Sequence, residues 1–358
     1  MIATMLPSRL ALTLVAILAG CATTVPHETI VLDPLVLRRG DGGKVEVADA
    51  KRMFEAASAA YEAGRYDAAA GMFKEVADLF PTTAYAAHAH FNGALALQRL
   101  KRWEDAAAEL RLARKAMSGT ADIRDVLYQL SRCYDHLERW RPLVKVSKEL
   151  LKSPALSVQD RVEGRARLGV AYYRLGRLAE AEREILTALE DHRQNLSVPS
   201  LKQNVYVAHA QYVIGAIYQD LFTLIKFKLP VESMRRDLTD KSNFFVKSQN
   251  AYLACIRLNE AEWSVAAGFQ LGKLYEDFYE DMMAAEVPPE LDESDKKEYF
   301  EELKRHVKPL VVRAIDVYER NLGMSDRFGR ATEWTQKTVM RLERMRDVLR
   351  ADFKDTPD

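Results

Sequence analysis

The stretch "LGVAYYRLGRLAEAEREILTAL", from Leu168 to Leu189, decides the fold of this 358-residue chain. It divides at Gly176 into two halves that both have the apolar spacing of an amphipathic helix. Small residues at Gly169 and Ala181 would let two antiparallel helices approach closely. We therefore predict a helical hairpin over this stretch.

Parts of this pattern recur elsewhere in the chain. The sequences "YVIGAIYQDLF" (Tyr212–Phe222) and "FQLGKLYEDFY" (Phe269–Tyr279) share an aliphatic–Gly pair followed three residues later by a Tyr. In the first half of the chain an aromatic residue recurs in steps of 37, at Tyr66, Trp103 and Trp140. A single hairpin cannot cover its own apolar faces, so we expect the copies to be stable only when stacked on one another.

The repeated unit resembles the tetratricopeptide repeat (TPR), whose period is about 34 residues. The resemblance rests on the spacing in Leu168–Leu189 and on "YEAGRYDAAAGMFKEVADLFP" (Tyr61–Pro81), with its Gly, aromatic and small residues and its closing Pro. It implies an all-α solenoid of about six TPR-like hairpins. We expect four repeats in residues 49–196, and in residues 197–358 two divergent repeats with inserts that form loops or extended helices, followed by a capping helix over 331–353.

The N-terminal sequence "MIATMLPSRLALTLVAILAGC" is typical of a secretory signal, because its apolar part is too short to span a membrane. Its end, Leu18-Ala19-Gly20-Cys21, resembles the lipobox of bacterial lipoproteins. That resemblance implies a signal peptide over residues 1–20 and lipidation of Cys21, and Ala22 after it implies sorting to the outer membrane. The alternative is an ordinary signal that is cleaved near Ala19 and leaves Cys21 unmodified.

Residues 21–48 contain two Pro and a Gly cluster and show no helical periodicity, so we expect a flexible tether between the lipid and a folded body in the periplasm. The other cysteines, Cys133 and Cys255, fit apolar helix faces in separate repeats. We expect two buried thiols there, with a disulfide as the alternative in an oxidising compartment.

The sequence offers little to support catalysis or nucleic-acid binding. Lys plus Arg and Asp plus Glu number 52 each, with no basic stripe. No phosphate-binding loop, nucleophile elbow or zinc-binding helix motif is found. We therefore expect no enzymatic activity, no cofactor, no metal site, no nucleic acid and no small-molecule substrate.

The TPR resemblance also implies a partner-binding groove. In the family, the fifth position of each first helix faces the concave side, and here five of the six such positions are aromatic, which suits the docking of a peptide or helix. The alternative is that these rings pack between adjacent hairpins. The predicted groove residues are Phe54, Phe91, Tyr128, Tyr212 and Phe269, with Ala166 as the non-aromatic member.

The second half of the chain resembles the TPR outer-membrane lipoproteins of the myxobacterial gliding-motility (Agl–Glt) machinery. The resemblance rests on "KSQNAYLACIRLNEAEWSVAAGFQLGKLYEDFYEDMMAAEVPPELD" and "YFEELKRHVKPLVVRAIDVYERNL". It implies a non-enzymatic scaffold that binds other periplasmic and outer-membrane subunits of an envelope complex. A pilotin-like assembly factor is the alternative, and a cell-wall enzyme is a third hypothesis.

Overall fold

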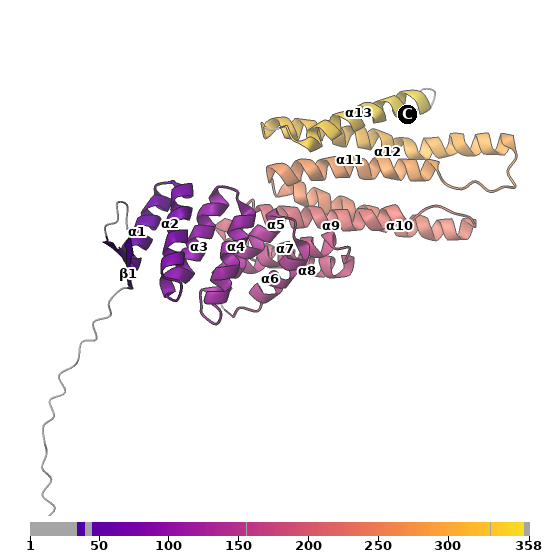
Figure 1. The fold of residues 1–358 in the computed structure, drawn as a ribbon. Helices are drawn as coiled ribbons and strands as arrows, with labels where there is room; N and C mark the ends of the chain where they lie inside the picture. The colour runs from indigo at the N-terminus through magenta and orange to yellow at the C-terminus, as the bar shows by residue number, and fades with distance from the viewer. Residues whose placement is uncertain (1–33, 40–44, 155, 330, 354–358) are drawn as a thin grey trace, which may run out of the picture.

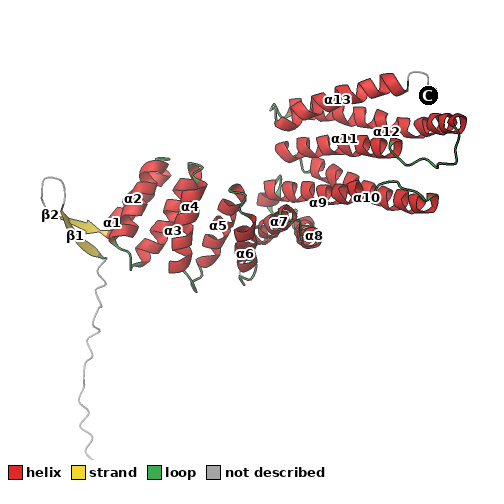
Figure 2. Cartoon of the chain, turned by 45° about the vertical axis from the view of Figure 1, so that its right-hand side comes forward, coloured by secondary structure: helices red, strands yellow, loops and turns green. Residues whose placement is uncertain are grey.

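The computed structural model describes residues 34–39, 45–154, 156–329 and 331–353. The described chain consists of helices apart from one two-stranded sheet, β1 (Leu35–Arg39) and β2 (Val45–Asp49) (Figure 1 and Figure 2). The helices form six consecutive pairs and a last single helix, which confirms the predicted all-α, TPR-like array with its capping helix. The helices are α1 (Ala50–Glu62), α2 (Tyr66–Leu79), α3 (Ala84–Arg99), α4 (Trp103–Ala116), α5 (Ile123–His136), α6 (Trp140–Leu150), α7 (Val158–Arg174), α8 (Leu178–Gln194), α9 (Val205–Leu224), α10 (Val231–Arg257), α11 (Ala261–Met283), α12 (Glu293–Arg327) and α13 (Glu333–Asp352), with a short 3₁₀ turn at Pro199–Leu201.

The apolar core runs along the array as a row of overlapping clusters. One cluster joins β2 to α3, the next joins α3 to α7, and two further ones join α7 to α10 and α9 to α13. Each hairpin therefore buries its apolar faces against its neighbours, as a repeat array requires. The row also turns: α1–α4 stand side by side, whereas α9–α13 run nearly across them in both views (Figure 1 and Figure 2).

The turn inside each of the first four hairpins has one residue with a left-handed backbone. It is Gly64 in the first hairpin and Gly176 in the fourth, with φ of 74° and 73°. The second and third hairpins place Lys101 and Glu138 there, with φ of 59° and 53°. Because L-residues rarely adopt this conformation, only the two glycine turns are evident from the sequence.

The aromatic residues that recur in steps of 37 each begin the second helix of a hairpin. From there the ring contacts the last turn of the first helix of the next hairpin, where a basic or imidazole group lies over it. The same contact therefore joins three successive pairs of repeats. The pairs are Arg99 over Tyr66 at 5.0 Å from the ring centroid, His136 stacked on Trp103 at 3.8 Å between centroids, and Arg174 over Trp140 at 5.6 Å.

The repeated aliphatic–Gly pairs place a glycine where a ring of the second helix packs onto the first. A Cβ at Gly215 would lie 2.6 Å from the Tyr252 ring, and a Cβ at Gly272 would lie 2.3 Å from the Tyr318 ring. Both tyrosines are fully buried. The ring that fills the space beside each glycine therefore comes from the opposite helix, and not from Tyr218 or Tyr275, which follow the glycines in the repeated pattern.

Gly272→Ala is expected to lower the free energy of unfolding by about 1–2 kcal/mol. Overpacking against Tyr318 costs about 1–3 kcal/mol, and the better helix propensity of Ala returns up to about 1 kcal/mol. Gly323→Ala on α12 is the control, because no atom lies within 4 Å of its added Cβ. Denaturant unfolding should show the control equal to or more stable than the natural chain, and equal stability of the two variants would contradict this packing.

The inserts in the last two hairpins are mostly helical. Short connections over residues 225–230 and 284–292 precede α10 and α12, which are 27 and 35 residues long. The capping helix α13 is tied to the last hairpin by the buried Glu276, which accepts from the Tyr318 hydroxyl at 2.8 Å and from Arg341 at 3.1 Å. Extended helices are one of the two forms that we expected the inserts to take.

The predicted tether contains a β-hairpin in its described part, which corrects the expectation of a flexible segment there. β1 pairs antiparallel with β2, with Leu37 opposite Val47, and Ala48 is buried against α1. A hairpin signal is present in the apolar run of β1, the Gly-rich stretch after it and the alternating Val-Glu-Val of β2, and helical periodicity does not detect it. Cys21 and its lipobox lie outside the described residues, so lipidation stays a prediction.

The two remaining cysteines are confirmed as buried free thiols. Cys133 Sγ accepts from Gln98 Nε2 at 3.1 Å, and Cys255 lies near the Ala208 and Trp263 carbonyls at 3.4 Å. Burial raises the pKa of the Cys133 thiol to about 11. Within the described residues, no helix is long and apolar enough to cross a membrane.

Candidate functional site: an acidic groove

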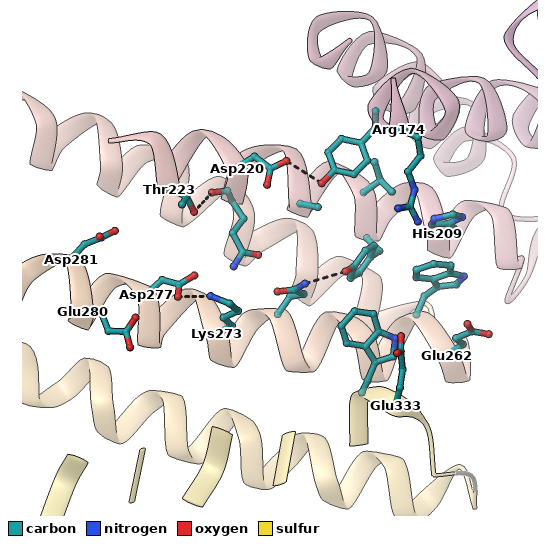
Figure 3. Close-up of a pocket in the computed structure, with 18 of the residues that line it drawn as sticks. Arg174, His209, Asp220, Thr223, Glu262, Lys273, Asp277, Glu280, Asp281 and Glu333 are labelled. Atoms are coloured by element: carbon teal, nitrogen blue, oxygen red, sulfur yellow. Dashed lines mark hydrogen bonds and ion pairs between the residues drawn. The ribbon is translucent and has the colours of Figure 1, made fainter. Parts of the chain in front are cut away.

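The first helices of the last repeats enclose a groove of about 780 Å³, which we call the acidic groove (Figure 3). Helices α7, α9, α11 and α13 supply its walls, with Glu138 from the turn after α5 and Lys226 from the connection after α9. Since α7, α9 and α11 are the first helices of their hairpins, the groove lies on the side that the TPR resemblance predicts for partner binding. Its lining includes Glu138, Tyr173, Arg174, His209, Tyr212, Asp220, Lys226, Glu262, Trp263, Gln270, Lys273, Asp277, Glu280, Asp281, Glu333 and Trp334.

Seven acidic and only three basic residues line the groove, so its field is negative although the whole chain has no net charge. Two of the basic groups are already paired within it, Lys273 with Asp277 and Lys226 with Asp281, both at 2.5 Å. Glu138 and Glu262 are exposed and have no ion-pair partner within the described part of the chain. These carboxylates are therefore available to a basic partner.

Asp220 adds a carboxylate of a different kind on the α9 side of the groove. It accepts from the Tyr173 hydroxyl at 3.0 Å, a bond that Figure 3 shows crossing from α7 to α9. Partial burial raises the pKa of Asp220, and the tyrosine bond opposes that rise. The bond therefore fixes the position of the carboxylate without supplying a positive charge.

An aromatic cluster forms one end of the groove. The Tyr212 ring lies 5.1 Å from Trp263 and 6.3 Å from Trp334, measured between centroids. His209 stacks on Trp263 at 3.8 Å with an angle of 7° between the ring planes. Gln270 Nε2 donates to the Tyr212 hydroxyl at 3.2 Å. These interlocked side chains give a stiff contact surface at low entropic cost to a ligand.

Only one of the five aromatic residues predicted to line a partner groove lies in the acidic groove, namely Tyr212. Phe54 and Phe91 are partly buried, and their rings pack against the core clusters of the first repeats. Phe269 is 6% exposed and packs on Trp334. Tyr128 is turned towards a buried carboxylate, Glu163, to which its hydroxyl donates.

The alternative that these rings pack between hairpins therefore describes Phe54, Phe91, Tyr128 and Phe269 in this structure. Ala166, the non-aromatic member, is also buried. Whether any of the five residues contacts a partner stays a prediction.

Sequence reasoning missed the two tryptophans and the unpaired carboxylates. Trp263 lies in the first turn of α11 and Trp334 in the first turn of α13. The family's fifth helix position does not select either residue. A comparison of the first turns of successive first helices could have found them, because both tryptophans begin helices that follow a hairpin.

His209 makes stability depend on pH. Burial and, to a smaller extent, the positive charge of Arg174 lower its pKa to about 3. A histidine in the unfolded chain titrates near pH 6.5. Below that pH the unfolded state therefore binds a proton at this residue that the folded state does not bind. Folding stability should therefore fall as the pH drops from about 6.5 towards 3.

We expect this histidine to account for about 1–2 kcal/mol of the stability lost between pH 7 and pH 5. His209→Phe keeps the stacking on Trp263 and removes the titration, so its urea unfolding should lose that much less over the same interval. His88→Phe at an exposed position of α3 is the control and should keep the natural slope. Identical slopes for all three proteins would contradict the buried, neutral imidazole.

Among the described residues, no group of three or more His, Cys, Asp or Glu side chains could hold a metal ion. The groove carboxylates are spread along its length: Figure 3 shows Glu262 and Glu333 near the aromatic end, and Asp277, Glu280 and Asp281 towards the other. This arrangement suits an elongated partner better than a single ion.

A tetratricopeptide repeat family model matches residues 53–83, which cover most of α1 and α2. No curated protein sequence is similar enough to count as a match. Several solved TPR structures are similar to the chain at low identity. YrrB, described as a TPR protein with an unusual peptide-binding site, is 15% identical over 57% of this chain and 86% of its own, with a TM-score of 0.39.

Two further structures cover more of the chain. The C-terminal part of a TPR repeat-containing protein from Cytophaga hutchinsonii is 9% identical, covers 82% of this chain and 95% of its own, and has a TM-score of 0.44. A tetratricopeptide repeat protein from Parabacteroides merdae is 12% identical, with coverages of 83% and 98% and a TM-score of 0.43.

Proposed function

We propose that this TPR-like helical array is a non-enzymatic scaffold that binds a basic segment of a partner protein in its acidic groove. The observation that carries the proposal is the groove itself, where unpaired carboxylates lie beside a stiff aromatic cluster. Lysine and arginine side chains can pair with the carboxylates and lie over the rings at the same time.

The length of the groove favours a polypeptide as the partner. Its lining residues come from helices of three repeats and from the capping helix, so a ligand must extend over several helix widths to contact them all. TPR arrays use such concave surfaces to hold extended or helical segments of other proteins.

We further propose that the scaffold is attached to the outer membrane through lipidated Cys21 and works within a multiprotein envelope complex, as the motility-lipoprotein resemblance implies. More than one acyl chain would give stable attachment. Cys21→Ser should then shift the protein from the membrane fraction to the soluble periplasmic fraction. A Cys21→Ser protein that stays in the membrane fraction would contradict the anchor.

Glu262→Lys tests the groove. Glu262 lies in the first turn of α11, and Glu232 lies at the matching place in α10, outside the groove, so Glu232→Lys makes the same charge change as a control. After crosslinking in intact cells, partners should be recovered by the natural chain and by the control, and several-fold less by Glu262→Lys. Equal recovery by all three would count against the groove as the interface.

A pilotin-like assembly factor is the second candidate, and deletion separates the two roles. A scaffold stays in the finished complex. An assembly factor is absent from it, although its loss abolishes the client's multimer.

A further inference from the structure

A second concave site lies on the other face of α11, between α10 and α12, and we call it the basic cleft. Its volume is about 360 Å³, and no residue lines both it and the acidic groove. Helices α10 and α12 each pack extensively on α11 and have little contact with each other, which leaves the cleft open between them.

Apolar side chains from three helices line much of the basic cleft. Leu253 and Ile256 face it from α10, Val317 and Met324 from α12, and Leu271 from the α11 floor. Gly268 of α11 also lies on the floor. Leu271 and Met324 are recessed, at 4% and 9% exposed, and Leu253, Ile256 and Val317 are partly buried.

Three arginines follow one side of the cleft at intervals of seven residues, Arg313, Arg320 and Arg327. Seven residues are two helical turns, so successive guanidinium groups start about 10.5 Å apart along α12. The acidic residue between the first two, Asp316, pairs with Arg313 at 3.2 Å and with Arg320 at 2.7 Å. Arg327 is exposed and makes no ion pair in the described part of the chain.

The opposite wall does not cancel this charge. Between Lys241 and Arg257, α10 contains no acidic residue. The cleft therefore joins a recessed apolar floor to a positive rim. Charge complementarity requires an occupant that is apolar on one side and acidic on the other.

We infer that the basic cleft binds an amphipathic helix of a partner protein that carries Glu or Asp at heptad spacing beside leucine-sized residues. The heptad spacing of the arginines matches the repeat of a helix that lies along α12, with one carboxylate opposite each guanidinium group. Because the floor is recessed, a partner helix can reach it by inserting side chains into the cleft. A bilayer surface would instead contact residues that protrude from the protein. This site is independent of the acidic groove, so either interaction can fail without the other.

A displayed library of 21-residue helical peptides, randomised among Ala, Leu, Gln, Lys and Glu, tests the inference on the full chain in detergent. Selection on the natural chain should enrich Glu at heptad spacing with Leu between. The best peptide should bind Arg320→Glu/Arg327→Glu at least about tenfold more weakly, because two guanidinium–carboxylate pairs become repulsive.

Arg111→Glu/Arg141→Glu is the matched control, since both residues are exposed on second helices, α4 and α6, far along the array. It makes the same change of net charge and should keep full affinity. Selection without Glu enrichment, or peptides that bind the cleft variant and the control equally, would overturn the inference.

Two further measurements exclude other occupants. Vesicles of phosphatidylglycerol and phosphatidylcholine should bind the Cys21→Ser form of the natural chain and of the cleft variant equally, and selective loss in the variant would assign the cleft to a lipid surface. Sedimentation should show the same mass for both proteins. Self-association that the cleft variant and Glu262→Lys both abolish would instead assign the cleft to a second copy of this chain.

Discussion

Glu163→Gln is expected to lower the free energy of unfolding by about 3 kcal/mol, because it leaves a buried arginine without its counter-charge. Glu163 and Arg167 of α7 are 2% and 1% exposed, and a guanidinium nitrogen lies 3.5 Å from the carboxylate. The Arg167 guanidinium lies over the rings of Tyr128 and Tyr206, at 4.8 Å and 4.4 Å from their centroids.

The same carboxylate holds three repeats together. It accepts hydrogen bonds from the Tyr128 hydroxyl of α5, from Gln159 of α7 at 2.9 Å and from Asn204 before α9 at 2.7 Å. Glutamine keeps the shape of the side chain but cannot accept from all these donors while it compensates the guanidinium charge. The loss of stability should therefore be concentrated around α5, α7 and α9, where the array turns.

Amide hydrogen exchange, measured helix by helix, tests where the stability is lost. Amides of α5, α7 and α9 should exchange faster in Glu163→Gln, while those of α1 and α2 keep their protection, because each repeat contacts only its neighbours. Glu190→Gln makes the same change at a surface ion pair with Arg193 and should leave exchange unchanged. A uniform effect along the array, or none at all, would contradict the proposed role of this network.

Lys241→Met is expected to lower the free energy of unfolding by about 3 kcal/mol, because it removes the buried ammonium group from two backbone carbonyls and a carboxylate. Lys241 of α10 is completely buried. Its Nζ donates to the Phe222 and Ile225 carbonyls at the end of α9, at 2.7 Å and 2.9 Å, and pairs with Asp281 of α11 at 2.7 Å. Methionine fills a similar volume but satisfies none of these oxygens.

This lysine links the end of α9 to a carboxylate of the acidic groove, so its loss should also loosen that end of the site. Amide exchange should rise in the last turn of α9 and over residues 225–230. Lys247→Met is the control on the same helix, at an exposed position over the Tyr218 ring. Equal unfolding midpoints for the two variants would show that the buried ammonium group contributes no more than a surface one.

Much of the fold could be predicted from the sequence. The hairpin over Leu168–Leu189 and the two later glycine copies establish paired helices, because apolar spacing within one helix and a small residue at the contact are local properties. The turns at Lys101 and Glu138 could not be predicted from the sequence, because both residues adopt a left-handed backbone that Lys and Glu rarely adopt. The N-terminal β-hairpin carries a local signal in the alternating residues of β2 and in the Gly-rich stretch before them, which the expectation of a tether did not take into account.

By itself, then, the sequence determined that the chain forms stacked helical pairs with a capping helix. Only the tertiary structure decided where charged and aromatic side chains come together. The acidic groove combines Glu138 and Tyr212 from different repeats with Trp334 of the capping helix, and the basic cleft needs α10 and α12 on either side of α11. The physical reason is that the spacing along one helix fixes which of its sides is apolar. The angle at which successive hairpins stack depends on how whole side chains fit between helices, and that angle decides which outward-facing residues meet.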